Sequence, residues 1–222
     1  MTSHLWSATL RDRRGEKVIF LSHCLLNENT RYLGGAPRSG PVPEIVRACV
    51  DRGIGIVQLP CPEAHAWGGV LKRRLLAFFG ARGTVRYRVG IALLPVMLLY
   101  TRAVYRRLAR EAARQMRDLV ESGIDVIGIV GIDASPSCGV NLTLQIRRSL
   151  EALGALRDDA TGSEVNDIVR AAVVGGEGLF VTSLRRQLAR LGMTVPFGAH
   201  DLLRELDGLP SSFDLSSLRN DG

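Results

Sequence analysis

Short apolar runs bounded by glycine, proline and polar residues alternate along the chain with segments whose apolar residues recur every three or four positions. Runs of the first kind are typical of strands in a parallel sheet, and the second spacing indicates amphipathic helices. The pattern predicts strands over 17–22, 54–59, 125–131 and 193–197. It predicts helices over 43–53, 101–122, 142–153, 179–191 and 199–206. A polar loop is expected over 157–166, and 167–174 fits either a helix or a strand.

The alternation of strands and helices predicts an α/β protein with a three-layer, Rossmann-like fold and a mainly parallel sheet. A chain of 222 residues suits one domain over 1–222. Two segments depart from the pattern. The stretch 68–100 mixes apolar clusters with arginines and reads as an Arg-rich apolar insertion or lid, and the tail over 210–222 is expected to fray.

The insertion over 68–100 has two interpretations. Its apolar run Val89–Tyr100 contains Pro95 and is too short to span a bilayer. One interpretation is a segment lying on a membrane surface, with basic residues beside apolar anchors. The other is a lid or dimer arm whose apolar face packs on protein. We favour the second, and with it a homo-oligomer, because monomers avoid large exposed apolar patches.

The net charge is +7, and every basic residue except Lys17 and Lys72 is an arginine. Arginine suits phosphate recognition, but an arginine excess equally reflects genomic base composition. A stripe at helical spacing is formed by Arg102, Arg106, Arg110, Arg114 and Arg117. Such a stripe is usually a solvated helix face, so RNA is an unlikely partner.

The N-terminal segment, MTSHLWSATLRDRRGEK, has neither the apolar stretch nor the small-residue cleavage site of a secretion signal. The four cysteines form no Cys-x-x-Cys pair, which argues against a disulfide framework. The expected location is therefore the cytoplasm.

Three cysteines each directly follow a predicted strand: Cys24, Cys61 between two prolines, and Cys138 in the segment Ser135–Gly139. The carboxyl ends of parallel strands meet at one edge of a sheet, where ligands bind. We therefore expect the three thiols to converge on one metal or cluster site. Cys49 lies instead on the apolar face of a predicted helix and is expected to be a core residue.

Three thiolates leave two kinds of metal open. A structural zinc ion would need a fourth ligand, which His23 or His65 could supply. A cubane iron–sulfur cluster normally takes four cysteines, so three would leave one iron open to solvent or substrate. An open, soft Lewis acid suits chemistry on sulfur.

The motifs around these cysteines resemble the 2-thiouracil desulfurase (desulfidase) family. They are Cys24-Leu25-Leu26 followed by Arg31-Tyr32, Cys61-Pro62-Glu63, and Ser135-Pro136-Ser137-Cys138-Gly139. The longer string His23–Tyr32 and Gly139-Val140-Asn141 resemble one branch of that family. The match covers roughly 17–67 and 101–198. It implies a 4Fe–4S cluster held by Cys24, Cys61 and Cys138, and a reaction that takes sulfur from a thiolated pyrimidine.

Chemistry suggests catalytic roles for three residues. Glu63 is expected to face the open iron and to act as acid or base for water attack; its alternative role is to cap loop amides. Ser135 is expected to donate to a ring carbonyl or a cluster sulfide, or else to cap a helix. Asp133 is expected to orient the base or water, or only to form the loop.

Four more residues are candidates for substrate binding. Arg31 is expected to bind a nucleotide phosphate and Tyr32 to stack on a base, or both pack the loop down. Ser137 is a second donor beside Ser135, and Asn141 is an orienting amide. After Cys61-Pro62-Glu63 the chain departs from the family pattern with Ala64–Gly69 and the Arg-rich stretch, which bears on substrate identity.

The sequence therefore predicts a desulfidase that depends on a 4Fe–4S cluster, acts on a small thiolated pyrimidine base or nucleotide, and releases sulfide. The alternative is a non-catalytic sulfur carrier or sensor that binds an iron–sulfur cluster or zinc through the same thiolates.

Overall fold

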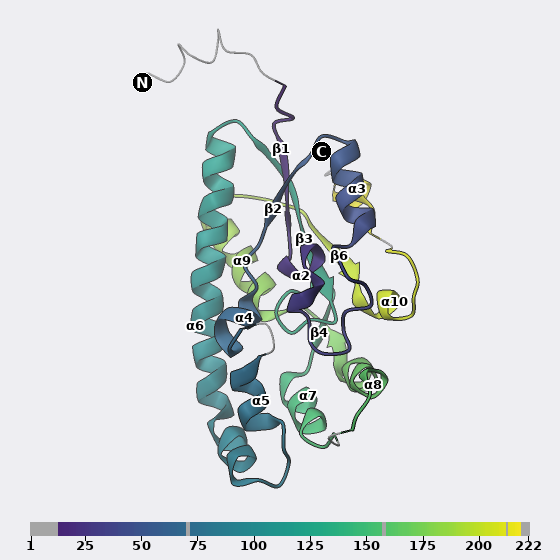
Figure 1. The fold of residues 1–222 in the computed structure, drawn as a ribbon. Coiled ribbons are helices and arrows are strands. Elements are labelled where there is room, and N and C mark those ends of the chain that lie inside the picture. The colour runs from purple at the N-terminus through teal and green to yellow at the C-terminus, as the bar shows by residue number, and fades with distance from the viewer. Residues whose placement is uncertain (1–12, 70–71, 157–158, 212, 219–222) are drawn as a thin grey trace.

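The computed structural model describes residues 13–69, 72–156, 159–211 and 213–218. Outside these ranges lie residues 1–12 of the N-terminal segment read for a secretion signal, residues 70–71 of the insertion, residues 157–158 of the polar loop, and Ser212 and 219–222 of the tail. Within them the chain folds as a mixed α/β protein around a parallel sheet, compatible with the expected layout (Figure 1).

In the described residues the main sheet has four parallel strands in the order β2-β1-β3-β6. They are β1 (Lys17–Leu21), β2 (Gly55–Gln58), β3 (Asp125–Asp133) and β6 (Phe197–Asp201). Ile19, Phe20 and Val130 on the two central strands are fully buried. The strands are apolar on both faces because helices cover both sides.

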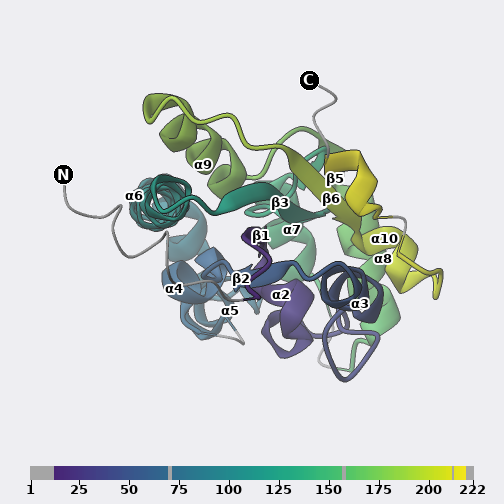
Figure 2. The same ribbon diagram turned by 90° about the horizontal axis from the view of Figure 1, so that it is seen from above.

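The helices, in chain order, are α2 (His23–Leu26), η1 (Glu28–Thr30), α3 (Pro43–Asp51), α4 (Pro62–Trp67), α5 (Arg73–Phe79), α6 (Val85–Glu121), α7 (Ile146–Leu153), α8 (Gly162–Ala172), α9 (Leu179–Arg190), α10 (Leu202–Leu206) and η2 (Leu215–Leu218). Helices α6 and α9 lie on one side of the main sheet and α3 on the other (Figure 2). Below the sheet, α5, α7 and α8 form the lower end of the molecule in Figure 1.

The strand order reverses between β1 and β3. From β1 the chain runs through α3 to β2 at one edge, then returns through α4, α5 and α6 to β3 on the other side of β1. In open parallel sheets, the crevice beyond the carboxyl ends of two such strands is where ligands bind. The segments that follow β1 and β3 meet there, and the Ser22 N–H donates to the Val130 carbonyl.

Three predicted elements have different bounds in the structure: the helix over 101–122, the strand over 193–197 and the helix over 199–206. The helix predicted over 101–122 begins at Val85, where the Thr84 hydroxyl accepts from Tyr87 N at 3.2 Å. It continues through Pro95, which faces solvent, so water can reach the backbone carbonyl left without a donor. The last strand is Phe197–Asp201 rather than 193–197, and α10 therefore begins only at Leu202.

Segment 142–175 also differs from its prediction. The expected helix over 142–153 is preceded by a short strand, β4 (Leu142–Leu144), which pairs antiparallel with β5 (Val173–Gly175). The expected polar loop ends early because Thr161 and Glu164 form a capping box that starts α8. Segment 167–174, left open between helix and strand, contains both.

The described part of the C-terminal tail folds back onto the sheet, in contrast to the fraying we expected. Leu215 and Leu218 of η2 are buried. A Cβ at Gly128 on β3 or at Gly198 on β6 would press against the Leu218 side chain. These two glycines therefore leave room for Leu218, a contact between distant segments that the local pattern of the tail does not reveal.

Candidate metal centre and active site

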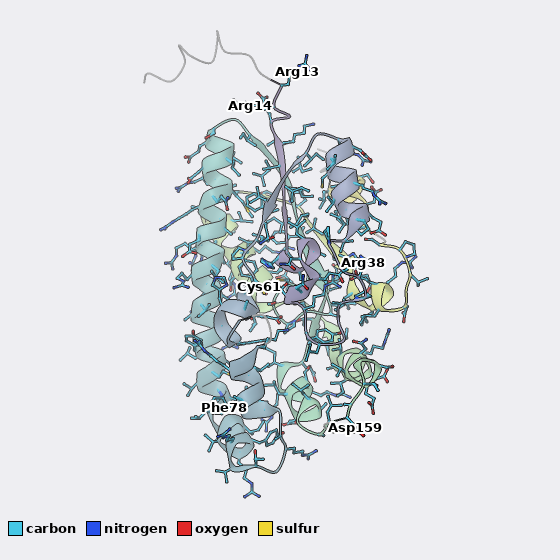
Figure 3. All side chains as sticks on the ribbon, in the orientation of Figure 1. Arg13, Arg14, Arg38, Cys61, Phe78 and Asp159 are labelled. Carbon is cyan, nitrogen blue, oxygen red and sulfur yellow. The ribbon has the colours of Figure 1, made fainter. Side chains whose placement is uncertain are left out.

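The three predicted cysteines line one cavity of about 360 Å³ at the carboxyl edge of the sheet. Cys24 lies in α2, directly after β1, and Cys61 is the N-cap of α4. Cys138 lies in the loop after β3. Figure 3 shows Cys61 near the middle of the molecule, between α4 and α2. Cys49 lies elsewhere, fully buried on α3, as expected of a core thiol.

The three thiols interact electrostatically with one another. The pKa of Cys24 is raised to about 12, chiefly by burial; Arg31 opposes the rise, and a negative charge on Cys61 contributes to it. Burial also raises the pKa of Cys138 well above its usual value, with contributions from Cys24 and Cys61. The pKa of Cys61 is raised by burial and by Glu63. Burial outweighs the nearby charges of Arg31 and Lys72 and favours the protonated form of these thiols.

A site for a single metal ion and a site for a cluster need different spacings between their ligands. Among the described residues, no three His, Cys, Asp or Glu side chains converge closely enough to hold a single metal ion. A cubane cluster is several ångströms across, so thiolates at its corners lie further apart than ligands of one ion. The two histidines considered for zinc each have a partner at Nδ1: His23 Nδ1 accepts from Gln58 Nε2 at 2.7 Å, and His65 Nδ1 lies 2.8 Å from the Cys61 carbonyl oxygen.

Glu63 is the carboxylate of this cavity. It lies in the first turn of α4, two residues after Cys61, and its Oε1 accepts from the Ser137 hydroxyl at 2.8 Å. Its Oε2 lies 2.8 Å from Lys72 Nζ. Glu63 is therefore held by two side chains rather than by loop amides, the alternative role considered for it.

Ser135 and Ser137 organise the loop that carries Cys138. The Ser135 hydroxyl accepts from the backbone N–H of Cys138 at 3.1 Å and lies 3.1 Å from the Ser137 hydroxyl. The Ser137 hydroxyl also lies 3.6 Å from Cys138 Sγ. Both serines line the cavity beside Glu63. A Cβ at Gly139 would collide with the Leu142 carbonyl oxygen, so the loop requires glycine there.

Asp133, at the end of β3, accepts hydrogen bonds from the same loop. Its Oδ1 accepts from the backbone N–H groups of Val140, Asn141 and Leu142, and its Oδ2 accepts from Asn141 Nδ2 at 3.2 Å. The next residue, Ala134, adopts a left-handed conformation with φ of 62°. Neither Asp133 nor Asn141 lines the cavity, so the contacts shown are those of loop-forming residues.

Arg31 and Tyr32 both line the cavity, and both have partners within the protein. Arg31 is buried, with one guanidinium nitrogen 2.7 Å from Glu205 Oε2 and the other 3.4 Å from Glu28 Oε1. The Tyr32 hydroxyl donates to Asn166 Oδ1 at 2.9 Å. The Arg31 guanidinium is thus already neutralised, in contrast to the phosphate-binding role expected for it.

Lys72 is a cavity residue that sequence reasoning missed. Burial lowers its pKa, but the adjacent Glu63 carboxylate, with Cys61 and Cys24, outweighs burial and raises it. Its ammonium also lies 5.8 Å from the centre of the Tyr32 ring. A signal was available: Lys72 is one of two lysines in an arginine-rich chain. Lysine presents a compact point charge with three rotatable donors, whereas arginine presents a planar fork.

Tyr105 of α6 is not among the residues that line the cavity, but it interacts electrostatically with Glu63 and Cys138, and sequence reasoning missed it. It is fully buried, its ring contacts Trp67 and Phe180, and its hydroxyl has no partner in hydrogen-bond geometry among the described residues. Burial raises its pKa well above the usual value, and charges on Glu63 and Cys138 raise it further. No sequence signal identifies it, because its spacing is that of any core position on a helix.

No protein-family model matches the chain, and no solved structure matches it. A 50-residue segment is 36% identical to the uncharacterized protein MJ0003 of Methanocaldococcus jannaschii. That segment covers 22% of this chain and 32% of the relative, so the chain matches about a third of that protein's length.

Proposed function

We propose that this protein is an iron–sulfur-dependent desulfidase with a Rossmann-like fold, which removes sulfur from a thiolated pyrimidine base or nucleotide. The observation that carries the proposal is the presence of Cys24, Cys61 and Cys138 in one cavity with the Glu63 carboxylate. A 4Fe–4S cluster would be held by the three thiolates, and when bound it supplies an iron with an open position for a sulfur ligand.

The residues around the thiols suit a hydrolytic reaction. Exchange of a thiocarbonyl sulfur for oxygen consumes one water and releases one sulfide, so no external electrons are needed. Glu63 would take a proton from the water that attacks the thiocarbonyl carbon. Ser137, which donates to Glu63 Oε1, fixes the direction of the carboxylate. Lys72, paired with Oε2, keeps a positive charge beside the carbon where negative charge develops.

Asp133 is a positioning residue in this proposal. Its oxygens bond to the loop that carries Ser137 and Cys138, and they are not directed into the cavity. Asn141 completes the same contact from the loop side. Of the candidate catalytic residues, Glu63 is therefore the one that carries the proton transfer, and Ser135, Ser137 and Lys72 surround it.

The effect of Glu63→Gln distinguishes a catalytic desulfidase from a non-catalytic sulfur carrier. The protein is purified without oxygen and reconstituted with iron and sulfide, and three quantities are measured: iron content, visible absorption, and sulfide released from 2-thiouracil. We expect Glu63→Gln to keep the iron and the absorption while turnover falls at least 100-fold. The control is Glu111→Gln, an exposed carboxylate on α6. Undiminished turnover in Glu63→Gln would contradict the role of Glu63.

The metal assignment has its own control. Cys138→Ser should lower the iron content severalfold, whereas Cys49→Ala, on α3, should leave it unchanged. A protein that loads zinc and never iron would end the cluster proposal. A protein that holds the cluster but releases no sulfide from any thiolated base would instead favour a carrier or sensor.

A further inference from the structure

The cavity extends from the thiols into a region walled by apolar side chains. These belong to α5, α7 and α8, the helices at the lower end of Figure 1, and include Leu75, Ile146, Leu150, Leu153, Ile168 and Val169. Apart from Ser149 on α7, the polar lining side chains belong to the segments around the three cysteines, between His23 and Tyr32, at Glu63 and at Ser135 and Ser137, or to Lys72 beside Glu63. A pocket with one reactive polar end and an apolar body selects a ligand of the same polarity pattern.

The charged groups of this cavity have partners already. Within the described residues three Arg, Lys, Asp or Glu side chains line it, namely Arg31, Glu63 and Lys72. Arg31 pairs with Glu205 and Glu28, and Lys72 pairs with Glu63. A phosphate would have to displace one of these carboxylates or enter the apolar region without a cation, and both are costly.

We infer that the substrate is an uncharged thiocarbonyl compound with an apolar substituent, rather than a nucleotide. This inference rests on the proposed function and narrows its substrate class. The thiocarbonyl lies at the cysteine end, and the substituent enters the region between α5, α7 and α8. Leu75 of this wall lies in the stretch that departs from the family motifs, whereas the wall residues of α7 and α8 lie in the part over which the resemblance extends.

Binding to the cluster-free protein tests the inference without turnover. Trp67 lines the cavity and is 5% exposed, so its fluorescence reports occupancy. Trp6→Phe leaves Trp67 as the sole tryptophan. The probes are 2-thiouracil, its 6-methyl and 6-propyl derivatives, and 2-thiouridine monophosphate. Affinity should rise up to about fourfold for each added methylene, and the nucleotide should bind more weakly than the free base.

Two variants localise the effect. Ile168→Asn, in the apolar wall, should remove most of the gain from the propyl group, and Val120→Asn, exposed on α6, should not. Equal affinities along the alkyl series, or tight binding of the nucleotide, would overturn the inference even if the loaded protein released sulfide. If affinity rose with the length of the alkyl group but the loaded protein released no sulfide, the apolar site would be supported and the proposed function would not.

A separate observation concerns the outer face of α6. Between Glu63 and Glu111 the chain contains ten basic residues and no acidic residue. In the same stretch, the exposed apolar side chains Val85, Val89, Leu93, Val96 and Tyr100 follow helical spacing on α6. The insertion therefore buries only one of its faces on protein, and the other face is apolar and basic.

Helix α6 is long and apolar enough to cross a membrane by length and composition. Its packing argues against crossing. Leu94 is buried, and a Cβ at Gly90 would press against Phe78 and Phe79 of α5, so this part of α6 is fixed to the protein. The uncharged run between Arg88 and Arg102 is also only about 20 Å long, less than the ~30 Å of a hydrocarbon core.

We propose that this face of α6 binds the surface of an anionic membrane. Lipid phosphates would neutralise arginines such as Arg86 and Arg88, while Leu93 and Val96 enter the acyl boundary. A second copy of the chain fits less well, because pairing two such faces would bring arginines together with no acid in the stretch to neutralise them. The charge of this face therefore favours lipid over the dimer expected from sequence.

Vesicle sedimentation tests this contact. Full-length protein should bind vesicles of phosphatidylcholine with 30% phosphatidylglycerol, bind pure phosphatidylcholine weakly, and dissociate at high salt. Leu93→Asn/Val96→Asn/Leu99→Asn should lower the partition coefficient at least tenfold, whereas Val120→Asn should not. Light scattering without lipid measures whether the protein forms a dimer instead. A dimer that these substitutions dissociate, in a protein that ignores both vesicle types, would overturn the membrane assignment.

Discussion

Lys72 Nζ lies 2.8 Å from Glu63 Oε2, and the two side chains are only 15% and 11% exposed. The pair joins the segment after α4 to the cysteine cavity. It gives the carboxylate beside the thiols a fixed direction and a permanent counter-charge. Because burial raises the cost of an unpaired ion, each partner depends on the other.

Lys72→Gln should leave the iron content and visible absorption unchanged and lower turnover about 100-fold, because the charge that offsets developing negative charge is lost. Lys72→Arg should recover part of the rate, since it restores the charge without the compact geometry. The control is Lys17→Gln, the other lysine, exposed at the start of β1. Equal turnover in wild type and Lys72→Gln would show that Lys72 only fills space.

Alkaline pH should destabilise the cluster-free protein. The folded pKa of Cys24 is about 12, above its ordinary value of 9.0, so the native state favours the protonated thiol. This contribution is fully present below pH 9 and is lost as pH rises toward 12. The free energy of unfolding, measured with urea, should fall by up to about 1.4 kcal/mol per pH unit from this thiol. Cys24→Ala should reduce the slope; an unchanged slope would contradict the assigned pKa.

Loading of the cluster should show the opposite dependence on pH. The thiols must lose their protons to become ligands, so binding releases protons and strengthens as pH rises. Iron uptake at fixed iron and sulfide should therefore increase between pH 7 and 9, and bound cluster should protect all three cysteines from iodoacetamide. Cys49, which is fully buried outside the cavity, should stay unlabelled in the folded protein whether or not the cluster is bound.

Glu205 holds a buried charge network beside the cavity. Glu205 accepts from Arg31 at 2.7 Å, lies 2.6 Å from Arg38, and contacts His200 Nε2 at 2.8 Å. Glu205→Gln should cost about 3–5 kcal/mol of unfolding free energy, because the buried arginine loses its carboxylate. Glu151→Gln removes an exposed pair with Arg147 and should cost less than about 1 kcal/mol. Similar losses in both variants would show that burial of the network adds nothing.

Asp133→Ala should loosen the loop that carries Cys138. Three backbone N–H groups lose their acceptor, at a cost of about 2 kcal/mol, and the iron content should fall severalfold. Asp133→Asn keeps one acceptor oxygen and should retain most of the iron. If Asp133→Asn instead lost turnover while its iron content stayed normal, Asp133 would belong among the catalytic residues.

The amino-acid pattern alone was enough to predict the strands β1, β2 and β3 and the cysteines that follow them. Their strands are short, apolar and closely bounded by turns, so local pattern fixes them, and parallel topology brings their carboxyl ends to one edge. Cys24, Cys61, Cys138, Glu63 and Ser137 could be placed together on that basis.

Which of these side chains remain available to a ligand depends on contacts between distant segments, and these are visible in the folded structure alone. Glu205 neutralises Arg31 across 174 positions, Lys72 reaches Glu63 from the insertion, and Leu218 closes over Gly128. These contacts depend on side-chain packing between distant segments, which period and spacing do not encode. The apolar wall from α5, α7 and α8 arises in the same way, since each helix shows only an ordinary amphipathic pattern until the three are brought together.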